Sequence, residues 1–200
     1  EASQDEVICS TEIETLKIIP SRVDLTGAEI ELVSREKREK ILKTALNGVI
    51  EEYEFVVIDC PPSLGLLTLN ALAVSNSVLI PMQCEYYALQ GLSHLLKTLK
   101  LVKKSINPDL KVEGILLTMM DSRTLLATQV KDQVQKYFSD FLLKTIIPRN
   151  VRLSEAPSHG KPIMLYAGRS RGADAYVELA KEIILRSKTD ERTLLTSTAV

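Results

Sequence analysis

The sequence lacks the many closely spaced cysteines of disulfide-rich secreted proteins and zinc-binding domains, and it lacks a large net charge. It has only three cysteines, Cys9, Cys60 and Cys84, and a formal net charge of −1 over 200 residues. The cysteines are far apart, have no metal-binding spacing and suggest no disulfide framework, so a reducing cytoplasm fits best. A near-neutral chain has no bulk attraction for DNA or anionic membranes, and any nucleic-acid contact must come from a local basic cluster.

Two further absences concern membranes and the start of the chain. No apolar run approaches the roughly 18–20 residues that a membrane-spanning helix needs. The segment 1–6 is acidic and polar, so we expect no signal peptide. There is no initiator methionine, and the first apolar run, 16–20, already looks like a strand that ends at a proline. We therefore expect this chain to be a fragment.

What the sequence does contain is an alternation of short apolar runs with longer helical patterns. This alternation indicates βαβ units, hence one α/β domain with a mostly parallel sheet and helices on both faces. We expect that domain to cover 1–187 and a loose polar tail to cover 188–200. Ligands of such sheets bind at the carboxyl ends of the strands. The predicted strands are 16–20, 55–58, 77–81, 112–118 and 143–148, and the predicted helices are 34–53, 64–74, 89–102, 125–138 and 173–186.

The sharpest local pattern is Phe55-Val-Val-Ile-Asp59-Cys-Pro-Pro62. Four consecutive apolar residues are typical of a strand buried on both faces, and Asp59 then stands at its end. This is the Walker B arrangement, in which a carboxylate holds Mg²⁺, usually through water. The plainer alternative is a strand followed by an aspartate-containing turn, which is common in α/β proteins.

Basic residues gather after the two later strands. From Arg149 to Arg171 there are four arginines and one lysine but a single acidic residue, Glu155. Arg123 follows the strand before them. A local positive patch suits salt-sensitive, sequence-independent phosphate contact. The alternatives are solvated surface arginines, Pro148 as a strand terminator and Asp121 as a helix cap.

Four longer stretches make the chain resemble the chromosomal ParA (Soj-like) partition ATPases. The resemblance extends over about 13–186, and its last stretch is long and specific. The Asp-Cys-Pro-Pro element by itself also fits relatives such as the cell-division regulator MinD. The four stretches are 25–32, 58–70, 83–91 and 147–160.

The resemblance implies an α/β, three-layer P-loop NTPase fold that binds ATP and Mg²⁺ and forms a nucleotide-sandwich homodimer. By position, Asp59 resembles the catalytic Walker B aspartate that holds Mg²⁺ through water. Pro148 and Asn150 lie where the family lines its adenine pocket.

The resemblance also implies a DNA-binding surface and a protein partner. Arg123 and Arg152 resemble arginines that contact DNA in the dimer, and Arg149 is grouped with them. DNA is bound without sequence preference, so we expect a cytoplasmic, nucleoid-associated protein for chromosome or plasmid segregation. A ParB-type centromere-binding partner stimulates hydrolysis in the family.

The departures from the family pattern concern the phosphates of ATP. The family's Lys-Gly-Gly-x-Gly-Lys-Thr loop does not occur in these 200 residues, and neither does its Asp-x-Asp-Pro-Gln motif. The loop supplies the N–H cradle and the lysines for the phosphates. We expect both motifs upstream of Glu1, so that the fold is incomplete and this chain alone does not hydrolyse ATP. Without the P-loop strand and helix, two strands would have unpaired edges, and we expect poor stability or assembly that covers them.

Two alternatives remain beside the partition ATPase. One is a natural truncated protein that binds DNA or a partner without catalysis, which the missing loop favours. The other is a MinD-like membrane switch, which needs a basic amphipathic C-terminal helix. The segment 188–200 has mixed charge and only one Leu-Leu pair, so we expect no membrane binding.

Overall fold

The computed structural model describes residues 4–197 as an α/β protein. Its contacts divide the chain into two compact units. The first comprises Glu1–Asn76 and Leu99–Leu110, and the second comprises Ser77–Thr98 and Lys111–Val200. The prediction of one domain over 1–187 stays a prediction.

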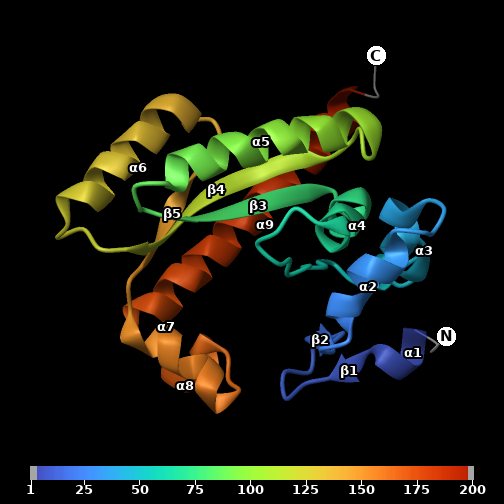
Figure 1. Cartoon of the computed structure of the whole chain (residues 1–200). Helices are drawn as coiled ribbons and strands as arrows, with labels where there is room; N and C mark the ends of the chain where they lie inside the picture. Colours follow the sequence, from blue (N-terminus) through green and yellow to red (C-terminus); the bar gives the residue numbers. More distant parts are fainter. Residues whose placement is uncertain (1–3, 198–200) are drawn as a thin grey trace. The chain divides into compact units, whose positions relative to one another are not determined.

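The second unit is built on a three-stranded parallel sheet (Figure 1). Its strands lie in the order β3 (Ser77–Gln83), β4 (Lys111–Met120) and β5 (Leu142–Pro148). The three strands predicted at 77–81, 112–118 and 143–148 are therefore confirmed, each slightly longer than expected. The middle of β4, at Ile115, Leu116 and Leu117, is apolar and buried, as is typical of a central parallel strand covered on both faces.

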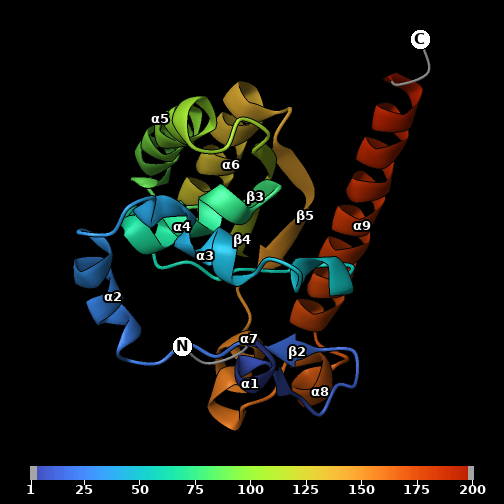
Figure 2. The same ribbon diagram turned by 90° about the vertical axis from the view of Figure 1, so that its right-hand side faces the viewer.

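Helices cover both faces of this sheet, which gives three layers (Figures 1 and 2). Helix α6 (Leu125–Phe138) and the part of α5 (Ala88–Ser105) that belongs to this unit lie on one face, and α9 (Arg171–Ser197) lies on the other. A core cluster joins β4, β5 and α9 through Leu116, Leu143, Ile147 and Leu179. Three short helices, α7 (Val151–Glu155), η3 (Ala156–His159) and α8 (Ile163–Ala167), connect β5 to α9.

A carboxylate of α9 compensates for an irregularity in β5. The register between β4 and β5 shifts after the pair Ile115–Leu142, so two backbone N–H groups of β5 leave the ladder. The N–H groups of Lys144 and Thr145 each donate to the Glu182 carboxylate at 2.9 Å. Burial acts to raise the pKa of Glu182, but these bonds and nearby Arg186 outweigh it and hold the pKa below its usual value.

The first unit consists mainly of short helices, and the buried side-chain amide of Asn70 connects several of them. Asn70 of α4 is 4 % exposed, and its side chain donates to the carbonyls of Arg38 and Leu66 and accepts the N–H of Leu42. These bonds tie α4 to the preceding helices. The elements are α1 (Gln4–Val7), β1 (Cys9–Ser10), β2 (Lys17–Ile18), α2 (Leu25–Leu32), η1 (Arg38–Lys40), α3 (Ile41–Ala45), η2 (Ile50–Glu52) and α4 (Leu66–Val74).

Several predictions for the first unit were wrong. The long helix predicted over 34–53 is broken into η1, α3 and η2, because Lys37 and Gly48 adopt positive φ values of 52° and 87°. The strand predicted over 55–58 has no strand assignment, and Val57 is 90 % exposed. A strand needs a neighbour to satisfy its backbone groups, and no described residue pairs with this segment.

Two end predictions also differ from the structure. The strand predicted over 16–20 is only the two residues of β2, paired antiparallel with β1. The last helix was predicted to end at Arg186, but α9 continues to Ser197. Residues 198–200 of the predicted tail lie outside the described residues.

Replacing Glu182 with alanine should lower the free energy of unfolding by about 1–3 kcal/mol, because two N–H groups lose a charged acceptor. Glu178→Ala is the matched control on the same helix, since its ion pair with Lys181 is exposed. It should cost less than about 1 kcal/mol. Urea denaturation of both variants near pH 7 measures the difference, and equal losses would contradict the role given to Glu182. The Glu182 contribution should also disappear as the pH falls through the lowered pKa, because the unfolded carboxylate takes up its proton first.

Candidate functional site

The carboxyl ends of β4 and β5 lie side by side. Met120 of β4 pairs with Pro148 of β5, and the N–H of Arg149 donates to the carbonyl of Met120 at 3.0 Å. The segments that leave the two strands therefore start together at one edge of the sheet. Just before this point, Met119 has a φ of 51°. This left-handed conformation costs a residue with a side chain roughly 1–2 kcal/mol. Such strain concentrates at functional sites.

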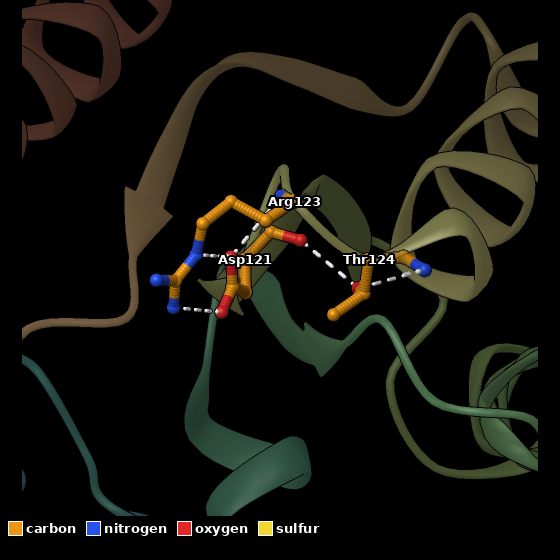
Figure 3. A network of polar contacts seen from close by, with 4 residues as sticks. Asp121, Arg123 and Thr124 are labelled. Carbon is orange, nitrogen blue, oxygen red and sulfur yellow. Dashed lines mark hydrogen bonds and ion pairs between the residues drawn. The ribbon is translucent and has the colours of Figure 1, made fainter.

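The segment after β4 carries a compact polar network (Figure 3). The Asp121 carboxylate accepts two side-chain bonds from Arg123, at 2.9 Å from Nε and 2.7 Å from Nη2. It also accepts the backbone N–H of Arg123 at 3.1 Å. Thr124, rather than Asp121, caps α6, because its hydroxyl oxygen accepts the N–H of Ala127. The helix-cap alternative for Asp121 is therefore wrong.

This network shifts the charge state of Asp121. The hydrogen bonds from the Arg123 side chain and backbone, followed by the charges of Arg123 and Arg149, lower the pKa of Asp121 to about 2. Asp121 is therefore ionised at neutral pH. The Arg123 side chain is 86 % exposed, whereas that of Asp121 is 21 % exposed, so the guanidinium lies at the surface and the carboxylate beneath it.

The segment after β5 begins with a helix cap. The Asn150 side chain accepts the N–H of Arg152 at 2.9 Å and so starts α7. Its side-chain amide N–H groups make no hydrogen bond to the described residues, which leaves them free to donate. Pro148 is half-buried and ends β5, as the strand-terminator alternative predicted.

Arg152 belongs to a second ion pair. Its Nη1 lies 2.9 Å from Oε2 of Glu155, and the same oxygen accepts the hydroxyl of Tyr166 at 3.0 Å. The Tyr166 ring stacks on His159 with centroids 4.8 Å apart. The hydrogen bonds from Tyr166 and then Arg152 hold the pKa of Glu155 below its usual value.

Beside this pair is an open hollow of about 400 Å³. Two arginines, Arg152 of α7 and Arg169 just before α9, contribute to its wall. The remaining lining residues are Ala167, Gly168 and Ser170. No described residue forms an ion pair with Arg169 or Arg171. Sequence reasoning placed Arg169 in a basic stretch but did not predict the hollow, because the chain reverses through α8 before Arg169.

The predicted site residues divide between the two units. Arg123, Pro148, Arg149, Asn150 and Arg152 all belong to the second unit, where the ends of β4 and β5 gather them. Asp59 belongs to the first unit and is exposed. Sequence reasoning missed the partners Asp121 and Tyr166. The Asp-x-Arg spacing was a usable signal for the first, since a short acidic side chain folds back readily onto the second residue after it.

The residues present fit only part of a magnesium–nucleotide site. A carboxylate such as Asp59 suits Mg²⁺, which binds one or two carboxylates together with phosphates and water. No group of three or more metal-binding side chains occurs within the described residues. These 200 residues also contain no Gly-Lys-Thr loop to hold phosphates. No step of phosphate chemistry follows from these residues alone.

Among residues 4–197, no helix combines the length and the apolar character needed to cross a bilayer.

Comparison with known proteins identifies the family. The AAA domain model AAA_31 matches residues 1–112. Sporulation initiation inhibitor protein Soj from Bacillus subtilis is 61 % identical over 178 residues, which are 89 % of this chain and 70 % of that protein. Chromosome partitioning protein ParA from Myxococcus xanthus is 56 % identical over 181 residues, which are 90 % of this chain and 64 % of that protein.

A solved structure gives the same picture of the fold. Cobyrinic acid a,c-diamide synthase from Mycobacterium smegmatis, with bound ADP and magnesium, matches with a TM-score of 0.78 and 35 % identity. The match covers 94 % of this chain and 69 % of that one. The parallel sheet covered by helices and the high identity to partition proteins lead to one conclusion: the chain belongs to the ParA/Soj family of chromosome-partitioning ATPases.

Proposed function

We propose that this chain provides the DNA-binding surface of an ATP-dependent, dimerising switch for chromosome or plasmid partitioning. The observation that carries the proposal is the gathering of Arg123, Arg149 and Arg152 at the carboxyl edge of β4 and β5. All three are exposed, and the chain as a whole is nearly neutral. A local cluster of this kind suits contact with phosphates of any base sequence.

Residues of each unit, taken separately, support a role in nucleotide binding. Asp59 would hold Mg²⁺ through water, and Pro148 with Asn150 would line the adenine pocket. Relatives of this fold bind such ligands, since the cobyrinic acid a,c-diamide synthase structure contains ADP and magnesium. The Asn150 amide N–H groups suit acceptor nitrogens of a base. In a version extended upstream that carries a phosphate-binding loop, ATP would then join two copies, and a ParB-type partner would stimulate hydrolysis and release the DNA.

A second candidate function is a non-catalytic binding protein. The specific observation in its favour is that these 200 residues contain neither Gly-Lys-Thr nor Gly-Lys-Ser. On this reading the DNA surface acts without hydrolysis. Both candidates use the same arginines, so DNA binding tests the shared part and ATP binding separates them.

The chain should bind short duplex DNA of any sequence with a strong dependence on salt, and Arg123→Ala or Arg152→Ala should weaken that binding. Each substitution should reduce the slope of log K against log salt by about 0.9, because one phosphate contact is lost. Fluorescence anisotropy with two duplexes of unrelated sequence at several salt concentrations measures this effect.

Lys136→Ala is the charge-matched control for the DNA experiment. Lys136 lies in the last turn of α6, away from the helix end that follows β4. It should change neither the affinity nor the slope appreciably. Equal effects of Arg123→Ala and Lys136→Ala, or absence of salt-dependent binding by the chain, would contradict the DNA assignment.

The 200-residue chain should bind ATP-Mg²⁺ weakly or not at all, and a version extended upstream should bind it, because phosphates need the cradle of backbone N–H groups and lysines. Isothermal titration calorimetry of both proteins measures the difference. In the extended protein, Asp59→Ala should abolish the dependence of binding on Mg²⁺. Tight ATP binding by the 200-residue chain alone would show that another element holds the phosphates.

A further inference from the structure

Arg123 and Arg152, the two arginines that resemble DNA-contacting arginines of the family, are each paired with a carboxylate in this structure. Arg123 makes a two-pronged ion pair with Asp121, at 2.9 and 2.7 Å. Arg152 makes a single-pronged pair with Glu155 at 2.9 Å. Each pair joins residues only two or three positions apart, so each is a local feature of the segment that leaves a strand.

In both pairs the carboxylate is held in place and the arginine is the exposed partner. Asp121 also accepts a backbone N–H, and Glu155 also accepts the hydroxyl of Tyr166. The arginine side chains are 86 % and 59 % exposed, against 21 % and 38 % for their carboxylates. The guanidinium groups can therefore turn toward a ligand while the carboxylates stay behind.

We propose that Asp121 and Glu155 mask Arg123 and Arg152, and thereby limit the affinity of this surface for nucleic-acid phosphates. The proposal rests on the proposed DNA-binding function. A phosphate that approaches Arg123 meets a neutral pair instead of a cation. It must compete with a carboxylate for the same N–H groups or bind beside a negative charge, and both weaken binding.

The neighbouring arginines provide a contrast within the same unit. No described residue lies within ion-pair distance of Arg169 or Arg171, so their full charge is available for a first contact. Arg152 and Arg169 share the wall of the hollow, which places a masked and an unmasked arginine together. In this proposal, the unpaired Arg169 and Arg171 attract the DNA first, and Arg123 and Arg152 bind phosphates only after they leave their carboxylates.

Asp121→Asn is the test, because asparagine keeps one oxygen that can accept the Arg123 backbone N–H, removes the negative charge and replaces the second acceptor oxygen with an NH2 donor. Glu155→Gln does the same for the second pair. Each variant should bind duplex DNA about two- to fivefold more tightly, the range expected from exposed ion pairs. The slope of log K against log salt should change little, because the same arginine contacts a phosphate before and after the substitution.

Glu178→Gln is the matched control, since the exposed Glu178–Lys181 pair has the same three-residue spacing as Glu155–Arg152 and a similar distance of 2.8 Å. It should leave DNA binding unchanged. A double-mutant comparison separates masking from a general gain of positive charge. In the Arg123→Ala background, Asp121→Asn should produce no gain, because there is no guanidinium left to release.

Three results would overturn the masking proposal while the wild-type chain still binds DNA. They are an Asp121→Asn gain equal to that of Glu178→Gln, an undiminished gain in the Arg123→Ala background, and weaker binding by Asp121→Asn. The last would mean that Asp121 orients Arg123 instead of masking it. Failure of the wild-type chain to bind DNA would instead overturn the proposed function.

Discussion

The parallel pairing of β4 with β5 is the constraint on which the candidate site depends. Because the two strands run in the same direction, their carboxyl ends meet, and the bond between Arg149 and Met120 joins the segments that leave them. Residues about thirty positions apart in the sequence thus become neighbours. The pairing is itself supported from α9, where Glu182 accepts the N–H groups that the irregular register leaves outside the ladder.

The chemistry at this edge depends on a balance of nearby charges. A chain with a net charge of −1 can attract a polyanion only through a local surplus of cations. The structure has such a surplus, yet two of the arginines are paired with carboxylates one turn away or less. If these pairs limit phosphate binding, then the surface would bind DNA reversibly, as a switch that must release its ligand requires.

Prediction from sequence succeeded where the local pattern already contained the tertiary information. Strands buried on both faces appear as continuous apolar runs, and the helix over 125–138 was predicted with the observed bounds because its apolar stripe and its breaks are local. Prediction failed where a distant partner or the backbone angle of a single residue decides the structure. The segment 55–58 has an ideal strand composition but no neighbour among the described residues, and Gly48 interrupts a helical pattern through its own backbone angle.

The candidate site was predictable in position but not in its contacts. The rule that ligands bind at the carboxyl ends of parallel strands located Arg123, Arg149 and Arg152 correctly at one edge. It did not reveal that Asp121 binds Arg123, or that Tyr166 returns to Glu155 through α8. These contacts depend on side-chain directions and chain reversals that residue types alone do not specify. The placement of Asp59 relative to this edge stays a prediction.

Hydrogen–deuterium exchange of the 200-residue chain with and without short duplex DNA at low salt tests the assignment of this edge most directly. DNA should slow exchange in the segments that leave β4 and β5, around 119–124 and 149–155, and should change it little at the amino ends of these strands. Protection confined to the first unit, or protection at the amino ends of β4 and β5 without any at the carboxyl ends, would contradict the assignment of this edge as the DNA-binding surface.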